Sequence, residues 1–446
     1  MTKQAKENAR RIAFDALTAV RKRDAFVGRV LDADFERRDA TSYERRLAVT
    51  LANGVLRHRR WLDWHIDRVS KMPIRKIEPA VLDALRLGLF QITHLDNVPD
   101  HVAVNETVAL APQRARGFVN ATLKTFVRER DAAGLPPIAC DTPVETLAVR
   151  TSHPTWLAEK WIAQFGMDDA ARILEADCRE PEPVFRIAHK AREAVIAELT
   201  AANCEAIPTT YSPVGIIARP MERVLRTPPF EMGRLTVQGE ASQIVTLLLD
   251  PKPGQRVLDL CAAPGGKSTH SAELVGPTGS VLAADLQPHR LELVTRNAKR
   301  LGLKNIETRA LDASKIDEMP DGPFERVLVD APCSSLGQLA KNPETKWRVD
   351  PSDPPRLFNL QNQILKNAAS RLLAGGRLVF AVCTLTDEET HQVVEAFLKE
   401  HADFAKVAAE TILPETCRPL VHDGYLRILP GEGINEGFFA AAFEKR

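Results

Sequence analysis

VLDLCAAPGGKSTH, residues 257–270, is the stretch around which the rest of the chain can be arranged. Apolar residues flank Asp259 in its first part and predict a short buried strand, and APGG at 263–266 predicts a tight turn into a helix that begins near Lys267. Glycines let a loop backbone approach a ligand closely, and the first turn of a helix offers unpaired N–H groups. The stretch therefore fits a nucleotide-like cofactor. Its glycines have neither the phosphate-loop spacing GxxxxGK[ST] nor the dinucleotide spacing GxGxxG.

From about Leu235 the chain alternates between strand-like and helix-length segments. This alternation predicts a parallel, doubly wound sheet, whose ligands bind beyond the carboxyl ends of the strands. Three aspartates follow such ends, and helix capping explains one such residue better than three. The expected strands are 256–260, 280–285, 305–310, 325–330 and 377–382, and the aspartates are Asp285, Asp312 and Asp330.

The acidic residue after the second of these strands indicates the type of cofactor. Asp285 lies 19 residues after Gly266, a distance at which a carboxylate can bind the two hydroxyls of a ribose held over the loop. The cofactor is therefore expected to contain a nucleoside. Because the chain has no phosphate-loop lysine motif, we expect S-adenosylmethionine in preference to ATP or NAD, with Asp312 facing the adenine amino group.

Two cysteines follow neighbouring strands, Cys333 within DAPCSS (330–335) and Cys383 within AVCT (381–384). A single buried cysteine is usually an inert apolar residue, but two at one cofactor site suggest chemistry, because a thiolate is a strong nucleophile. Carbon 5 of cytosine is too weak a nucleophile to accept a methyl group directly, so a thiolate must first add to carbon 6. One cysteine can make this adduct, and the second can assist its breakdown.

The N-terminal part of the chain is basic and helical by pattern. Residues 1–76 contain 19 Lys and Arg against 10 Asp and Glu, whereas the whole chain has a net charge of +1. Clusters such as RKR at 21–23 and RHRR at 57–60 suit contacts with phosphates, and solvated helix faces are the alternative. Apolar residues recur at helical spacing up to about residue 130 and predict a helix bundle. It contains no evident nucleophile, base or metal cluster.

Residues 134–154 contain four prolines and predict a linker, and strands expected at 184–188 and 215–219 indicate a small α/β domain after it. No apolar run is long enough to span a bilayer, the N-terminus lacks a secretory signal, and the seven cysteines never occur as CxxC. We therefore expect a cytoplasmic protein without disulfides, zinc or any other metal, and without membrane partners.

Four motifs resemble, in order and spacing, those of the Sun or RsmB family of RNA cytosine-C5 methyltransferases: CAAPGGK (261–267), DAPCSSLG (330–337), NPETKWR (342–348), and VCT followed by Glu388 and Glu389 (382–389). The segments at 85–111 and 117–126 resemble the NusB-like RNA-binding domain joined to these enzymes. The resemblance implies a NusB-like all-α domain (1–133), a linker (134–153), a small RNA-recognition-like α/β domain (154–234) and a class I, Rossmann-like methyltransferase domain (235–446). It also implies a monomer that acts on 16S rRNA.

The same resemblance implies roles for particular residues. Cys383 would be the nucleophile, Cys333 the release cysteine, Asp330 a hydrogen-bonding group for the cytosine ring, and Lys267 a further active-site contact. S-adenosylmethionine would be bound by Cys261, Ala262, Ala263, Pro264, Gly265, Gly266, Lys267, Asp285, Asp312 and Asp330. The chain departs from the family at Val382, where threonine is usual, at Ala340-Lys341, where paired arginines are usual, and at Gly239, where aspartate is common.

Two alternatives belong to other functional classes. The NusB-like bundle also fits an RNA-binding assembly or antitermination factor that has kept the methyltransferase fold and lost the reaction. An RNA N-methyltransferase would need no cysteine. Both cysteines and all three strand-end aspartates are present, which favours C5 methylation, and the effect of Cys383→Ala distinguishes the alternatives.

Overall fold

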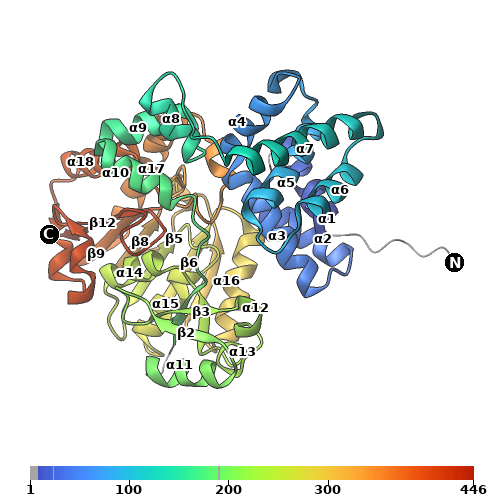
Figure 1. The fold of residues 1–446 in the computed structure, drawn as a ribbon. Helices are drawn as coiled ribbons and strands as arrows, with labels where there is room; N and C mark the ends of the chain where they lie inside the picture. The colour runs from blue at the N-terminus through green and yellow to red at the C-terminus, as the bar shows by residue number, and fades with distance from the viewer. Residues whose placement is uncertain (1–8, 24, 189–190) are drawn as a thin grey trace. The chain divides into compact units, whose positions relative to one another are not determined.

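The computed structural model describes residues 9–23, 25–188 and 191–446 (Figure 1). The chain divides into two compact units. The first comprises Met1–Arg179 together with Leu339–Val349, and the second comprises Glu180–Gln338 together with Asp350–Arg446. In the described part of the chain, no helix is both long and apolar enough to cross a membrane.

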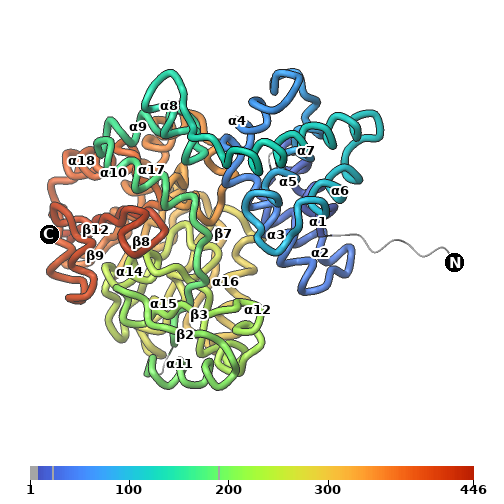
Figure 2. Tube along the Cα trace, in the orientation of Figure 1, coloured from blue at the N-terminus to red at the C-terminus, as the bar shows by residue number. Residues whose placement is uncertain are grey.

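Among the described residues, seven helices at the start of the first unit form the predicted bundle, which can be followed in Figure 2. The third helix begins with a capping box, in which Thr41 and Glu44 each accept a hydrogen bond from the other's backbone N–H. The fifth helix is buried along most of its length and forms the centre of the core. The helices are α1 (Ala9–Arg23), α2 (Val27–Arg37), α3 (Ser42–Arg57), α4 (Arg59–Val69), α5 (Pro79–His94), α6 (Asp100–Leu110) and α7 (Arg116–Ala133).

A helix, α8 (Pro143–Arg150), lies within the stretch predicted to be a linker. Thr142 caps it by accepting the N–H of Glu145, and proline is tolerated at its first position because that N–H has no partner within the helix. The proline content therefore marked a helix start as well as a connection. Helices α9 (Thr155–Phe165) and α10 (Met167–Ala176) follow, within the predicted middle domain, and their contacts group them with the first unit.

The segment Leu339–Val349 comes from the methyltransferase part of the sequence but belongs to the first unit. It contains a 3-10 turn, η4 (Thr345–Trp347). Lys346 Nζ donates to the carbonyl of Arg57 at 2.9 Å, and Trp347 Nε1 donates to the carbonyl of Leu56 at 2.7 Å. The segment is thus fixed to the C-terminal end of α3.

The second unit begins with a four-stranded antiparallel sheet in the order β2-β3-β1-β4. Its strands are β1 (Val184–Ile187), β2 (Glu205–Pro208), β3 (Gly215–Arg219) and β4 (Leu235–Val237), with the helices α11 (Arg192–Ala201), α12 (Met221–Val224) and α13 (Pro228–Glu231). The two predicted strands are confirmed. The edge strand β2 is mostly exposed and β4 has three residues, so neither gives a hydrophobic signal.

A larger mixed sheet follows, in the order β11-β12-β13-β9-β8-β5-β6-β7, with β10 paired to β13. The five predicted strands are confirmed and mutually parallel: β5 (Arg256–Leu260), β6 (Ser280–Asp285), β7 (Ile306–Ala310), β8 (Phe324–Asp330) and β9 (Leu372–Val382). The antiparallel strands were not predicted: β10 (Phe404–Val407), β11 (Val421–His422), β12 (Tyr425–Ile428) and β13 (Phe438–Lys445).

Helices cover the parallel strands in a doubly wound arrangement. Helices α14 (Glu240–Leu249) and α15 (Gly266–Val275) share one hydrophobic cluster with the sheet. Helices α17 (Asp353–Ala369) and α18 (His391–Glu400) share another, and α16 (Pro288–Arg300) packs beside β6 and β7. The carboxyl ends of β5, β6, β8 and β9 therefore carry the loops in which the candidate site residues lie.

Candidate active site

The glycine-containing loop connects β5 to α15, as predicted. Residues 261–265 form the turn, in which Cys261 and Gly265 have φ values of 73° and 99°. A Cβ at Gly265 would lie 3.0 Å from the Cα of Val294, so a larger residue would be both strained and crowded there. Asp259 is buried and accepts a hydrogen bond from Ser268 Oγ at 2.6 Å, and burial raises its pKa to about 7. The strand and the first helical turn are thereby joined beneath the loop.

Asp285, at the end of β6, binds this loop directly. Its Oδ2 accepts the N–H of Ala263 at 3.2 Å and its Oδ1 accepts the N–H of Gln287 at 3.0 Å. Arg290 lies 3.6 Å from the carboxylate and also donates to the carbonyl of Ala263. A carboxylate has about four acceptor sites, so capacity for two ribose hydroxyls remains. Asp285 thus lies against the loop predicted to hold the cofactor, and its contact with a ribose stays a prediction.

Asp312 follows β7 in the neighbouring loop. It accepts hydrogen bonds from the backbone and hydroxyl of Ser314 at 3.0 and 2.6 Å, and these bonds, chiefly that from the hydroxyl, lower its pKa. The carboxylate thus stays ionised and forms a local turn with Ser314. Its expected contact with an adenine amino group remains a prediction.

Removing the carboxylate of Asp285 is expected to weaken cofactor binding far more than RNA binding. A hydrogen bond to a charged group contributes about 1.5–3 kcal/mol, so Asp285→Ala should reduce affinity for S-adenosylmethionine by at least about tenfold. Calorimetric titration measures this directly, with Asp317→Ala, an aspartate of the η3 turn (Ile316–Glu318), as the control. Equal affinities in the two variants would exclude Asp285 from the cofactor site.

A partly buried ion pair joins the loop to the end of β8. Lys267 Nζ donates to Asp330 Oδ2 at 2.6 Å and lies 5.2 Å from the centre of the Phe438 ring. Burial lowers the pKa of Lys267, but the charge and hydrogen bond of Asp330 outweigh it, so the pKa is raised overall. The ammonium is therefore held charged at the base of the site.

The two cysteines predicted to act together lie side by side. Their sulfur atoms are 3.3 Å apart, and Ser335 Oγ lies 3.6 Å from Cys383 Sγ and 3.9 Å from Cys333 Sγ. The hydrogen bond between the sulfurs lowers the pKa of Cys383, against the effects of burial and of Asp330, and Lys267 lowers it further. The same bond, with burial, raises the pKa of Cys333. Cys383 is therefore the thiol that ionises first.

Cys261 is a third cysteine in this part of the chain. Burial raises the pKa of its thiol, and the negative charges of Asp330 and Asp285 raise it further. Cys261 is consequently a protonated thiol and not a competing nucleophile.

Glu389 fixes the loop that carries Cys333. Its buried carboxylate accepts the N–H and the hydroxyl of Ser334 at 2.8 and 2.5 Å, the hydroxyl of Thr386 at 2.8 Å and the amide of Gln361 at 3.0 Å. One side chain thus connects the loops after β8 and β9 with α17. Glu389 belongs to one of the motifs quoted above, and no role was predicted for it.

Loss of this hydrogen-bond network should lower the free energy of unfolding, and not only the rate of methylation. Glu389→Ala removes an acceptor from four buried donors, and each donor left unsatisfied costs roughly 1–3 kcal/mol, so we expect a loss of about 3 kcal/mol or more. Denaturant unfolding measures the loss, with Glu388→Ala as the matched control because Glu388 is only half-buried. Similar stabilities of the two variants would contradict the assignment.

The structure therefore brings together Lys267, Asp330, Cys333 and Cys383, and places Asp285 on the adjacent loop. Ser335 and Phe438 were not predicted. Ser335 could have been considered from its place two residues after Cys333, but Phe438 belongs to the unpredicted strand β13. Among the residues that the structure describes, no group of three or more His, Cys, Asp and Glu could hold a metal ion.

Family models match three parts of the chain. Residues 7–128 match the NusB family model, residues 153–222 match the ferredoxin-like domain of RsmF/B-like methyltransferases, and residues 246–444 match the 16S rRNA methyltransferase RsmB/F model. The chain is 36% identical, over 99% of both chains, to the Bacillus subtilis (strain 168) "Probable ribosomal RNA small subunit methyltransferase B". It is 33% identical to the "Ribosomal RNA small subunit methyltransferase B" of Escherichia coli O1:K1 / APEC, over 90% of this chain and 91% of that one. Among solved structures, "Crystal Structure of PH0851" covers 100% of both chains with a TM-score of 0.78 and 25% identity.

Proposed function

Because the chain belongs to the ribosomal RNA small subunit methyltransferase B family, we propose that it forms 5-methylcytosine in 16S rRNA. The methyl donor of the family is S-adenosylmethionine, and the residues around Asp285 fit its nucleoside part. One observation carries the choice of carbon 5: two sulfur atoms lie 3.3 Å apart beside the Lys267–Asp330 pair. Methylation of an exocyclic nitrogen would need neither sulfur.

The first step that we propose is addition of Cys383 to the cytosine ring. The thiolate forms a bond to carbon 6, and the electrons of the 5,6 double bond make carbon 5 nucleophilic. Negative charge develops on the ring oxygen and nitrogen during this addition. Lys267 and Asp330, held 2.6 Å apart, can supply the positive charge and the hydrogen bond that stabilise it. S-adenosylmethionine, when bound, supplies an electrophilic methyl group.

The second step is breakdown of the adduct. The proton on carbon 5 must be removed, its electron pair restores the double bond, and the bond from carbon 6 to Cys383 sulfur breaks. Cys333 is the group placed closest to the reacting sulfur. A hydrogen bond between the two sulfurs lets Cys333 donate its proton to the Cys383 sulfur as that sulfur leaves, and the Cys333 thiolate so formed can accept the proton from carbon 5.

The proposal is tested by methylation of 16S rRNA in vitro with labelled S-adenosylmethionine, followed by bisulfite sequencing of the product. We expect one protected cytosine with wild-type protein and none with Cys383→Ala. Methylation that survives Cys383→Ala would favour the N-methyltransferase alternative, and its complete absence with wild-type protein would favour the assembly-factor alternative. We further propose that the protein acts as a cytoplasmic monomer, which size-exclusion chromatography and fractionation can test.

A further inference from the structure

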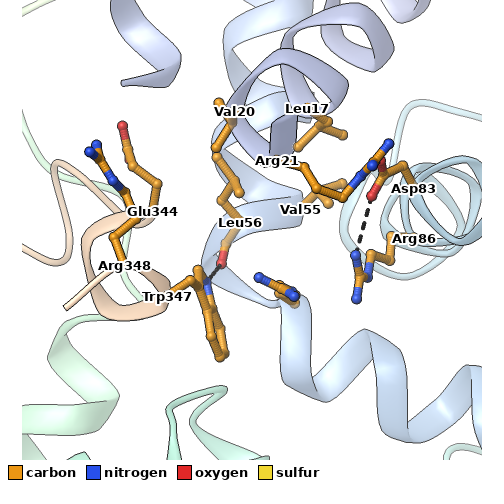
Figure 3. Close-up of a pocket in the computed structure, with 11 residues that line it drawn as sticks. Leu17, Val20, Arg21, Val55, Leu56, Asp83, Arg86, Glu344, Trp347 and Arg348 are labelled. Carbon is orange, nitrogen blue, oxygen red and sulfur yellow. Dashed lines mark hydrogen bonds and ion pairs between the residues drawn. The ribbon is translucent and has the colours of Figure 1, made fainter. Parts of the chain in front are cut away.

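A cavity of about 280 Å³ lies in the first compact unit, between the helix bundle and the segment Leu339–Val349 (Figure 3). Its charged lining consists of four arginines and two acidic residues: Arg21, Arg59, Arg86, Arg348, Asp83 and Glu344. The volume is close to the lower end of the range for small-molecule sites, about 300–1,000 Å³.

Two of the four arginines are already neutralised by acidic residues. Arg86 binds both carboxylate oxygens of Asp63, at 2.6 and 2.7 Å, and also donates to Asp83 at 3.2 Å. Arg21 donates to the other oxygen of Asp83 at 2.9 Å. Figure 3 shows Asp83 between these two guanidinium groups. Arg21 and Arg86 therefore form one wall of the cavity, and Asp83 between them holds both side chains in place.

Arg59 is different, because within residues 9–23, 25–188 and 191–446 no hydrogen-bond acceptor or acidic oxygen lies within bonding distance of its guanidinium. Its close contact is with the face of Trp347, whose ring centre is 5.1 Å away. Trp347 is fixed in turn by its bond to the Leu56 carbonyl, seen in Figure 3. Burial and the charge of Arg86 lower the pKa of Arg59, and the more distant aspartates that hold Arg86 offset only part of this effect. Arg59 is thus a positioned cation without a bonded counter-charge.

Glu344 does not supply that counter-charge. Its Oε1 accepts the N–H of Val27 at 2.9 Å, while its Oε2 is buried without a hydrogen-bond partner among the described residues. Burial raises the pKa of this carboxyl. Glu344 is therefore protonated more easily than an exposed glutamate, and the protonated carboxyl does not repel an anion.

We propose that this cavity binds a phosphate group, with Arg59 as its principal ligand and Arg348 and Arg21 at its rim. Guanidinium groups match the geometry of phosphate oxygens, and an anion here would complete the charge balance of the cavity. The phosphate is that of an RNA chain in the protein's working state, and free phosphate or a mononucleotide shares the same chemistry. The assignment of this phosphate to an RNA chain rests on the proposed function, whereas the binding of a phosphate group by the cavity does not.

The first arm of the test uses the full-length protein without RNA or cofactor. Inorganic phosphate and adenosine monophosphate are titrated by calorimetry into wild type, Arg59→Gln and Arg68→Gln. Arg68 is the matched control because it lies on the same helix and pairs with Glu129 outside the cavity. We expect Arg59→Gln to reduce phosphate affinity at least tenfold, Arg59→Lys to retain part of it, and Arg68→Gln to leave it unchanged.

The second arm measures affinity for a 16S rRNA fragment over a range of salt concentrations. Loss of one phosphate contact should reduce the slope of log affinity against log salt by about one in Arg59→Gln and not in Arg68→Gln. Val20→Phe, which fills the cavity while keeping Arg59, serves as a second variant, and thermal melting establishes that each variant is folded.

The outcomes separate the sources of the phosphate. A loss in both arms, or in the RNA arm alone, supports an RNA phosphate. A loss with free phosphate alone supports a phosphate pocket whose occupant is a free anion. If folded Arg59→Gln and Arg68→Gln match in both arms, or if Val20→Phe binds as well as wild type, the proposal is overturned. Absence of methylation activity affects none of these readouts, so it would count against the proposed function alone.

Discussion

A Cys333→Ala protein incubated with 16S rRNA and S-adenosylmethionine is expected to remain covalently attached to the RNA, whereas a Cys383→Ala protein is expected to form no such complex. In the proposed mechanism Cys383, whose pKa is lowered by its hydrogen bond with Cys333, supplies the attacking thiolate. Without it no bond to carbon 6 can form. Cys333 lies 3.3 Å from that sulfur, and in the same proposal it acts only after methyl transfer, so its removal should leave the adduct intact.

Both substitutions should reduce turnover by at least about 10³-fold, because residues that act as a unit in covalent catalysis fail together. The two variants should differ on a denaturing gel, where only Cys333→Ala should give a band of protein linked to RNA. Cys140→Ala, a cysteine of the first unit, serves as the control. A linked band with Cys383→Ala and not with Cys333→Ala would reverse the two roles. Full activity of both variants would contradict covalent catalysis altogether.

Four strands of the parallel half, β5, β6, β8 and β9, could be predicted because they are largely buried and rich in apolar residues. The same reasoning located Asp285 and Asp330, since both end such strands. The edge strand β7 (IETRA) is mostly exposed, and only the alternation of strands and helices predicted it. The antiparallel half could not be derived in this way. Strand β13 (FFAAAFEK) is apolar, but nothing in its sequence shows that it lies antiparallel beside β9, and Phe438 consequently could not be placed beneath Lys267.

In the candidate site, the neighbourhood of two residues could be predicted, but the contacts between their side chains could not. Lys267 and Asp330 are 63 residues apart, and each follows or ends a strand predicted for the same parallel sheet, so both were expected at one edge of it. The structure adds that these strands, β5 and β8, are neighbours. The hydrogen bond between Lys267 and Asp330 depends on side-chain conformations that periodicity does not determine. Glu389 gave no signal of its own, because an acidic residue in a polar segment is normally solvated.

The segment Leu339–Val349 could not have been assigned to the first unit from its sequence. Lys346 and Trp347 bind the backbone carbonyls of Arg57 and Leu56, and every residue has such a carbonyl. No complementary pattern of side chains therefore marks the partner. Its motif resemblance suggested a place in the catalytic domain, whereas its contacts place it against the helix bundle.

Replacing Lys267 by methionine is expected to move the acidic limb of the pH–rate profile to higher pH. The limb reports ionisation of the free enzyme's nucleophile. The positive charge of Lys267 lowers the pKa of Cys383, and the negative charge of Asp330 raises it. Lys267→Met removes the first effect and leaves the second unbalanced, so the thiolate forms only at higher pH. If the pKa of Cys383 rises by about one, the thiolate fraction at pH 7 falls by up to about tenfold.

Asp330→Asn, at the other member of the same ion pair, is expected to move the acidic limb in the opposite direction. It removes the charge that raises the pKa of Cys383 and leaves Lys267 without that counter-charge, so the acidic limb should move to lower pH. Loss of the proposed hydrogen bond to the cytosine ring should at the same time reduce the maximum rate. Single-turnover methylation measured across pH distinguishes the two effects, with Lys252→Met as a control because Lys252 pairs with Asp250 instead. If Lys267→Met lowers the rate equally at every pH, Lys267 acts on the cytosine or the cofactor and does not set the ionisation of Cys383.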